Sequence, residues 1–187
     1  MISTNQVVAI VGMCGSGKSI AASVFTKNGW YKIHFGQITM DELKKRGLEV
    51  SEQNERMVRE DLRNIHGDDA YAKLLLPIIR ETLLIGDVVL DGLYSFSEYR
   101  LLSSELGRVL KVLAVISDRK KRYDRLCSRD IRPLNNIDAE SRDYAEIKNL
   151  DKGGPIAIAD YFILNNSTKE VFEEDVYSFI NNIFCTK

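Results

Sequence analysis

The sequence predicts an α/β fold built around a parallel β-sheet, and three observations lead to this prediction. Short apolar runs alternate with longer stretches of helical periodicity along the chain, as they do in proteins that build parallel sheets through crossover helices. A glycine-rich loop joins the first apolar run to the first helical stretch. The 187 residues contain no internal repeat and no low-complexity linker, which indicates one domain of ordinary size.

The first element is a strand over 7–11 followed by the glycine-rich loop. Residues 12–19 read Gly-Met-Cys-Gly-Ser-Gly-Lys-Ser, which matches the phosphate-binding pattern G-x-x-x-x-G-K-[ST]. The helix-forming stretch 19–25 comes next, so backbone N–H groups and the positive end of a helix converge on one anion. In this pattern Lys18 binds the terminal phosphates and the Ser19 hydroxyl binds magnesium. The segment therefore predicts a site for a nucleoside triphosphate.

A second strand is expected over 31–35, followed by a mostly helical insertion, 37–86. Capping and stop residues predict three helices inside this insertion: 41–46 before Gly47, a second from the cap Ser51 to Gly67, and a third that Asp68 caps. Apolar side chains recur at helical spacing in the third helix, which Pro77 should bend. Their spacing indicates core packing rather than a ligand site.

The third strand, 88–90, ends at Asp91-Gly92. In open parallel sheets ligands bind at the carboxyl ends of the strands. Asp91 can therefore hold magnesium through water or orient an acceptor hydroxyl beside the phosphates. The alternative is an ordinary turn aspartate before a glycine. The phosphate-binding pattern upstream favours the functional interpretation.

A run of basic residues follows the fourth strand, 110–116. Its members are Arg119, Lys120, Lys121, Arg122, Arg125, Arg129 and Arg132. Arg122, Arg125 and Arg129 are three and four residues apart and can share one helix face. Lys120 and Lys121 are interpreted as solvated surface charge. Arg125 and Arg129 are interpreted as the cations that phosphoryl transfer needs from a second side of the phosphate.

The polar segment 129–155 is expected to act as a lid. It contains Arg142 and the pair Gly153-Gly154, which suits a hinged segment that closes over nucleotide and excludes water. The last strand is expected over 161–164. An amphipathic helix over 171–183 should then close the domain.

Composition excludes several classes of function. The chain has 26 basic and 27 acidic residues, so it has no general attraction for nucleic acid or anionic membranes. Its cysteines and histidines are scattered: Cys14, Cys127, Cys185, His34 and His66. They predict no disulfide framework and no metal site beyond nucleotide-bound magnesium. No apolar run reaches membrane-spanning length and few residues precede the first strand, so a cytoplasmic protein is expected. Nothing in the sequence indicates an oligomeric state.

These motifs resemble those of P-loop kinases of the nucleoside-monophosphate kinase and dephospho-coenzyme A kinase group, and they are similar to small adenylate-kinase-related proteins. The likeness covers nearly the whole chain, including the phosphate loop, Asp91-Gly92, Arg125 to Arg129, and Ala159-Asp160-Tyr161 with Asn165. It implies a three-layer P-loop NTPase fold: a five-stranded parallel sheet in the order 2-3-1-4-5, helices on both faces, 37–86 as an acceptor-binding insertion and 129–155 as the lid. It also implies a nucleotide-binding set formed by Gly12, Cys14, Gly15, Ser16, Gly17, Lys18, Ser19, Ile20, Asn165 and Asn166.

Three residues depart from the pattern of those kinases, and all three lie on the acceptor side. Gln37 stands where Asp is usual, and Met40 and Tyr94 stand where Arg is usual. A neutral amide is a poor general base, and a missing guanidinium removes bidentate recognition of phosphate. The sequence therefore predicts a pocket for a larger or less charged acceptor than an ordinary nucleoside monophosphate.

Two functions from different classes follow from these residues. The first is an ATP- and Mg²⁺-dependent phosphotransferase acting on a small nucleotide-like acceptor. Its expected catalytic residues are Lys18, Asp91, Arg125, Arg129 and Arg142, with Ser19 and Asp91 on the metal and Asp41 as a weaker candidate to orient the acceptor. The second is a nucleotide-binding switch or slow ATPase without a small-molecule acceptor. Nucleic-acid processing ranks last, because the basic run is short and a lid accounts for it.

Overall fold

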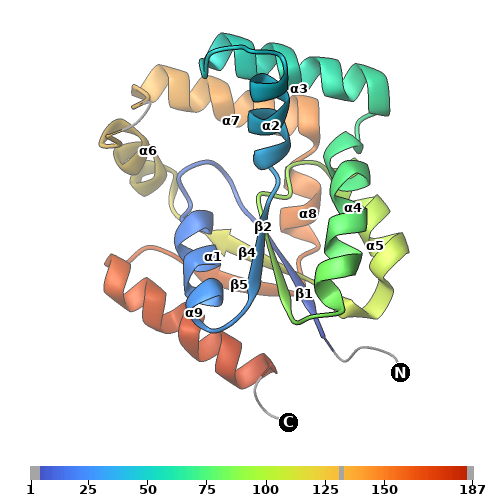
Figure 1. The fold of residues 1–187 in the computed structure, drawn as a ribbon. Helices are drawn as coiled ribbons and strands as arrows, with labels where there is room; N and C mark the ends of the chain where they lie inside the picture. Colours follow the sequence, from blue (N-terminus) through green and yellow to red (C-terminus); the bar gives the residue numbers. More distant parts are fainter. Residues whose placement is uncertain (1–4, 131–132, 185–187) are drawn as a thin grey trace.

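A computed structural model describes residues 5–130 and 133–184 of the chain. A five-stranded parallel sheet lies at its centre, with helices on both faces (Figure 1). The strands are β1 (Val7–Val11), β2 (Tyr31–His34), β3 (Val88–Asp91), β4 (Leu110–Ile116) and β5 (Tyr161–Leu164). Their order in the sheet is β2-β3-β1-β4-β5, which confirms the three-layer fold and the strand order expected from the sequence.

The central strand β1 explains how one short apolar run builds two cores. All five of its residues are buried, and successive side chains of a strand point to opposite faces. Val7, Ala9 and Val11 pack in one core with residues of α4 (Ala70–Leu83) and α5 (Phe96–Leu106). Val8 and Ile10 pack in the other with α1 (Lys18–Lys27) and α9 (Lys169–Phe184). The alternation fixes the sheet between its two helical layers.

The insertion between β2 and β3 consists of α2 (Gln37–Lys45), α3 (Glu52–His66) and α4. Two of its expected boundaries are wrong. Helix α2 begins four residues before the expected start at 41, directly after Gly36. The third helix is not capped by Asp68: its N-cap is Asp69, which makes no side-chain cap hydrogen bond, because Ala70 N–H donates to Gly67 O across a turn before the helix starts.

Helix α5 follows β3 and is an element that the sequence analysis did not predict. Ser95 starts it with a capping box, in which the Ser95 hydroxyl accepts from the N–H of Glu98 and the Glu98 carboxylate accepts from the N–H of Ser95. The short pattern Ser-x-x-Glu was the signal available for it. This capping box fixes the chain four residues after Asp91, the last residue of β3.

The segment expected as a lid folds into two helices, α7 (Asn136–Leu150) and α8 (Gly153–Ala157). The expected hinge, Gly153-Gly154, is instead the first turn of α8. A Cβ atom on Gly154 would lie 2.8 Å from the Phe96 ring, so this glycine allows close packing between α8 and α5. Arg132 and Cys185 lie outside the described residues. Within the described ranges, no helix combines the length and apolarity needed to cross a membrane.

Candidate active site

The loop between β1 and α1 depends on glycine for its shape. Gly12 and Gly17 have φ angles of 147° and 106°, which other residues rarely adopt. A Cβ atom on Gly12 would lie 2.4 Å from the carbonyl oxygen of Val115, and one on Gly17 would lie 2.2 Å from Asn165 Nδ2. The loop can therefore lie against β4 and Asn165 only with glycine at these positions. Its N–H groups and the N-terminus of α1 form a cradle suited to phosphate.

Lys18 lies at the start of α1, with its ammonium group folded back on the loop. Its Nζ donates hydrogen bonds to the carbonyl oxygens of Gly12 (2.9 Å) and Met13 (3.1 Å). Burial, together with the nearby charge of Lys152, lowers the pKa of Lys18 to about 8. The two carbonyl oxygens hold the ammonium group in place but do not compensate its full positive charge. An anion beside it would favour the protonated form of Lys18.

Arg125 and Asn165 support the loop from the far side. Asn165 is buried, and its Nδ2 donates to Ser16 O at 2.8 Å. Arg125, on helix α6 (Arg119–Cys127), donates through Nη2 to the backbone oxygen of Asn165 at 2.9 Å and through Nη1 to Ser117 Oγ at 3.1 Å. Asn166 Oδ1 accepts from the N–H of Asp118 at 2.9 Å. These contacts fix the position of the loop relative to α6 and β5.

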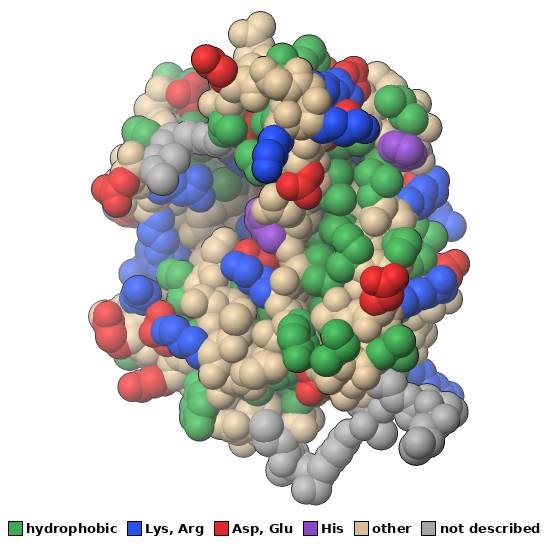
Figure 2. All heavy atoms as spheres, in the orientation of Figure 1, with side chains coloured by type: hydrophobic (Ala, Val, Ile, Leu, Met, Phe, Trp, Pro, Cys, Tyr) green, Lys and Arg blue, Asp and Glu red, His purple; other side chains and the backbone are tan. Residues whose placement is uncertain are grey.

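A buried ion pair that the sequence analysis did not identify joins α6 to α7. Arg122 makes two hydrogen bonds to Asp143, of 3.0 and 2.6 Å, and also donates to Cys14 O in the loop at 3.0 Å. Both side chains are about 90% buried. The two partners are far apart in sequence. The one signal in the sequence was the spacing of Arg122 four residues before Leu126, which puts both on the buried face of α6. The exposed side of α6 carries the solvated charges, which gather there in Figure 2.

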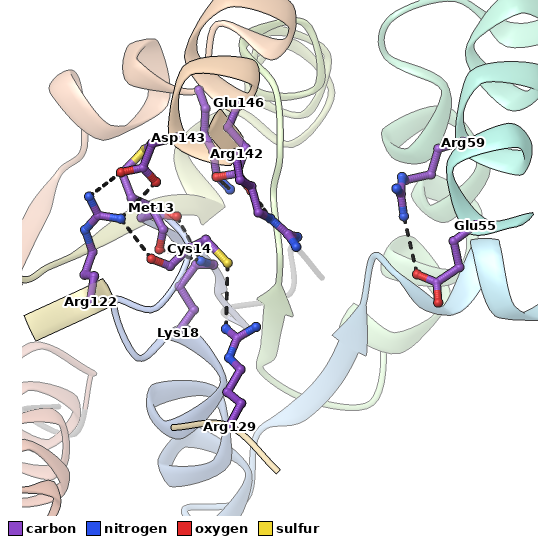
Figure 3. A network of polar contacts seen from close by, with 12 residues as sticks. Met13, Cys14, Lys18, Glu55, Arg59, Arg122, Arg129, Arg142, Asp143 and Glu146 are labelled. Atoms are coloured by element: carbon purple, nitrogen blue, oxygen red, sulfur yellow. Dashed lines mark hydrogen bonds and ion pairs between the residues drawn. The ribbon is translucent and has the colours of Figure 1, made fainter. Parts of the chain in front are cut away.

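Two further cations of the lid segment, Arg142 on α7 and Arg129 after α6, lie near the loop (Figure 3), and a third, Lys152, directly precedes α8. Arg129 Nη2 lies 3.7 Å from Cys14 Sγ. Arg142 Nε lies 3.4 Å from Glu146 Oε1, while the Lys152 ammonium contacts Glu146 Oε2 at 2.7 Å. Lys152 is 2% exposed, and the sequence analysis missed it because a lone lysine before a glycine pair carries no motif.

Asp91 ends β3 beside the loop. It pairs with Ile10 of β1 in the sheet register and is 4% exposed. His34, which the sequence left as an isolated histidine, lies on the neighbouring strand with Nδ1 3.4 Å from Asp91 Oδ2. The hydrogen bond to Asp91 raises the pKa of His34. In the described part of the chain no three His, Cys, Asp or Glu side chains form a metal cluster.

Aromatic rings pack together on the side of the site where the sequence analysis expected an acceptor. Tyr94 packs edge-on against Phe35 and Tyr71, with ring centroids 6.2 and 6.4 Å apart. The Lys152 ammonium lies 5.5 Å from the centroid of the Tyr94 ring. Burial raises the pKa of Tyr94 well above its usual value, which keeps the phenol neutral. Met40 packs at the edge of the same core. Gln37 donates to Asp41 Oδ1 at 2.8 Å.

Three fully buried side-chain atoms among the described residues have no hydrogen-bond partner. They are Ser16 Oγ in the loop, Arg63 Nε on α3 and Glu98 Oε1 on α5. Such atoms cost stability unless a partner satisfies them. Ser16 belongs to the loop, Arg63 lies over the Tyr71 ring, and Glu98 accepts the N–H of Tyr94 through its other carboxylate oxygen.

Comparisons with known proteins agree with this architecture. No protein-family model matches the chain. The chain is 35% identical to a UPF0200 protein of Thermococcus kodakarensis over 183 residues, 95% of this chain and 98% of that protein. Among solved structures, a dephospho-CoA kinase from Campylobacter jejuni has a TM-score of 0.57 at 15% identity, covering 96% of this chain and 97% of its own. A shikimate kinase from Acinetobacter baumannii, in complex with shikimate, has a TM-score of 0.60 at 14% identity, covering 99% and 96%. At these identities the solved structures show a shared fold alone.

Proposed function

The chain belongs to the UPF0200 family, and from its site we propose that it is a P-loop kinase that transfers the γ-phosphate of ATP to a small nucleotide-like acceptor. One observation carries the proposal: cations from separate segments converge on the loop. Lys18 comes from α1, Arg129 from the residues after α6, and Lys152, whose charge acts on Lys18, from the residue before α8. Phosphoryl transfer depends mainly on positioning and on neutralising charge around the transferring group, and this arrangement supports both.

The residues present fit ATP and Mg²⁺. A side chain at the tightest positions of the loop would clash with neighbouring atoms, so glycine is required there. Ser16 Oγ in the loop has no hydrogen-bond partner in the protein. Ser19 and Asp91 would hold the metal, because a hydroxyl and a carboxylate are ligands that Mg²⁺ accepts together with phosphate oxygens. When bound, the metal would supply charge stabilisation at the phosphates.

The chain's own residues divide the remaining work. Lys18 would exchange its two loop carbonyls for phosphate oxygens. Arg129 and Arg142 would neutralise the transferring group, while Arg125 and Asn165 keep the loop in place beneath it. Asp91 is the carboxylate best placed to orient an acceptor hydroxyl, since it is buried at the carboxyl end of β3 beside the loop. The aromatic wall of Phe35, Tyr71 and Tyr94 would exclude water from the acceptor side.

A nucleotide-binding switch or slow ATPase is the second candidate, and Gln37 favours it. Its amide donates a hydrogen bond to Asp41, and an amide cannot act as a general base. A site that binds ATP but lacks a productive acceptor would hydrolyse it slowly. The two candidates share the donor side and differ only in where the γ-phosphate goes.

The donor side is tested by Lys18→Ala. We expect this variant to lose measurable Mg-ATP binding in calorimetric titration while keeping its melting temperature close to that of the wild type, because Lys18 bonds only to loop carbonyls. Lys27→Ala is the matched control, since Lys27 is exposed at the other end of α1 and its loss should leave ATP affinity unchanged. Equal ATP affinity of Lys18→Ala and wild type would refute the assignment of the loop.

A further inference from the structure

We propose that His34 of β2 is a positioning residue that holds the Asp91 carboxylate in place for the metal and for the acceptor hydroxyl. The inference rests on the proposed function, in which Asp91 performs both tasks, and it deepens that function by naming the side chain on which Asp91 depends. His34 belongs to no motif in the sequence. Its place beside Asp91 follows from the pairing of β2 with β3, which sets the two residues opposite each other.

The contacts between the two residues fix the position of the hydrogen on the imidazole. His34 Nδ1 lies 3.1 Å from the backbone oxygen of Asp91 and 3.4 Å from Asp91 Oδ2. A carbonyl oxygen and a carboxylate oxygen both accept hydrogen bonds. Nδ1 therefore carries a hydrogen and donates it, whether or not Nε2 is also protonated. The contact occupies Oδ2 and leaves Oδ1 of the same carboxylate for a ligand.

Asp91 depends on His34 because its carboxylate has no other anchor among the described residues. Its side chain is 6% exposed, and of the side chains that the structure describes His34 alone makes an ion pair or hydrogen bond with it. Lys18 is near enough to interact with the charge of Asp91, but its ammonium group bonds to loop carbonyls. The terminal torsion of an aspartate is broad, so a single donor on one oxygen decides where the other oxygen points.

The end of β2 is also bound to Asp91 through its backbone. The N–H of Phe35 donates to Asp91 O at 3.0 Å, and this is the same oxygen that His34 Nδ1 contacts. Helix α2 begins two residues later, at Gln37. These two donors therefore attach the start of the helical insertion to the residue that is proposed to orient the acceptor.

Gly36 gives a second, independent indication that the position of the imidazole matters. Its φ and ψ angles, −62° and −16°, are helical and suit any residue, so the backbone does not require glycine here. A Cβ atom at this position would lie 2.6 Å from His34 Nε2. The absence of a side chain at Gly36 leaves the space that the imidazole occupies while it contacts Asp91.

A role in orientation fits the exposure of the pair better than a role in core packing. The His34 side chain is 44% exposed, so it contributes little buried surface, whereas Asp91 is buried. Partners that hydrogen-bond to metal ligands orient them, and their loss typically costs about 10–100-fold in metal affinity or activity. Gln37 cannot share this task, because its neutral amide already donates to Asp41.

The test measures metal binding and turnover separately. Mn²⁺, which accepts the same kinds of oxygen ligand as Mg²⁺, is titrated by electron paramagnetic resonance into the complex of the protein with a non-hydrolysable ATP analogue. ADP formation from Mg-ATP gives kcat and KM. The variants are His34→Ala, the conservative His34→Asn, whose amide N–H can replace Nδ1–H, and Gly36→Ala, which displaces the ring without removing it. His66→Ala is the control, since His66 is exposed at the end of α3.

We expect His34→Ala to weaken Mn²⁺ binding by about tenfold or more and to lower kcat by a similar factor, with the KM for ATP changed by less than about twofold. His34→Asn should recover part of both losses. Gly36→Ala should show the same two losses in the wild-type background and add nothing further to His34→Ala. His66→Ala should match the wild type.

The inference is overturned if His34→Ala keeps the Mn²⁺ affinity and kcat of the wild type, or if it changes only the melting temperature or the KM for ATP. It is also overturned if Gly36→Ala adds its full effect to that of His34→Ala, because the glycine would then act independently of the imidazole. A wild-type protein that binds neither the ATP analogue nor Mn²⁺ would instead refute the proposed function, so the two failures are distinguishable.

Discussion

Lys18 and Lys152 bring two positive charges to one side of the phosphate loop. Lys18 is the lysine of the sequence motif, whereas Lys152 comes from the start of α8 and is paired with Glu146. Burial is the larger cause of the lowered pKa of Lys18 and the charge of Lys152 is the second. An unliganded site with this much positive charge gains affinity for a polyanion, because the anion relieves the repulsion between the two ammonium groups.

The Lys152→Met variant tests this coupling through pH. Triphosphate binding favours protonated Lys18, so the ATP affinity of the wild type should fall as pH rises through about 8, the pKa of Lys18 in the free protein. Removing Lys152 removes a neighbouring positive charge and raises that pKa, so the fall should begin at higher pH. Dissociation constants for Mg-ATP between pH 7 and 9.5 provide the measurement. Lys148→Met, on an exposed part of α7, should leave the midpoint in place, and an unchanged midpoint in Lys152→Met would contradict the coupling.

At this scale the sequence predicted the residues that a local motif marks and missed those that only folding brings together. Lys18 and Asp91 stand beside recognisable neighbours in the chain. Lys152 and His34 do not, since each acquires its role from side chains on other elements. Gln37, Met40 and Tyr94 are departures that the sequence shows directly, whereas the position of Arg63 over the Tyr71 ring is visible only in the fold.

Helices α6 and α7 are held together and to the loop by Arg122 and Asp143. The bidentate pair is largely withdrawn from water, and Tyr123 adds a hydrogen bond to Asp143 Oδ2 at 3.2 Å. Because Arg122 also donates to Cys14 O, one side chain joins α6, α7 and the loop. The basic helix predicted from the sequence is therefore two-sided: its outer charges are solvated, whereas Arg122 and Arg125 are structural contacts of the loop.

Asp143→Ala should destabilise the fold by about 3–5 kcal/mol, because it leaves the buried Arg122 without its counter-ion. Urea unfolding curves measure the change. Asp124→Ala is the matched control: it breaks an ion pair with Lys120 in which both side chains are mostly exposed, and such pairs contribute about 0–1 kcal/mol. Equal losses in the two variants would show that Arg122 does not depend on Asp143. The double variant Arg122→Met, Asp143→Leu should recover part of the lost stability.

The sequence predicted all five strands, whereas it misplaced the starts of α2 and α4 and did not predict α5. The signals are strong for β1, β3 and β4, because buried parallel strands read as continuous apolar runs. Helix α5 was overlooked because its apolar face is short and its main signal is the Ser95–Glu98 capping box. The glycine pair 153–154 was interpreted as a hinge because a glycine pair in a polar segment is typical of flexible segments, whereas in the structure Gly154 permits close contact with Phe96.

For the molecule as a whole, the β2-β3-β1-β4-β5 order places the loop after β1 between the ends of β3 and β4. Helices α2, α3 and α7 lie beyond this end of the sheet, whereas α4 and α8 pack alongside the strands (Figure 1). A donor bound at the loop and an acceptor bound along the Tyr71–Tyr94 wall would then meet beside Lys18 and Asp91. In the proposed function, this division into a donor side and an acceptor side is what distinguishes a kinase from a simple ATPase.

The central claim is tested most directly by following the γ-phosphate of ATP with ³¹P NMR. Wild-type protein is incubated with Mg-ATP and each of AMP, dephospho-coenzyme A and shikimate, with Lys18→Ala as the inactive control. A kinase predicts a new phosphoryl resonance on one of these acceptors or on a related anionic compound, formed in step with ADP and absent in Lys18→Ala. Formation of ADP with inorganic phosphate alone, at a rate that none of the acceptors changes, would contradict the account and identify the chain as an ATPase or switch.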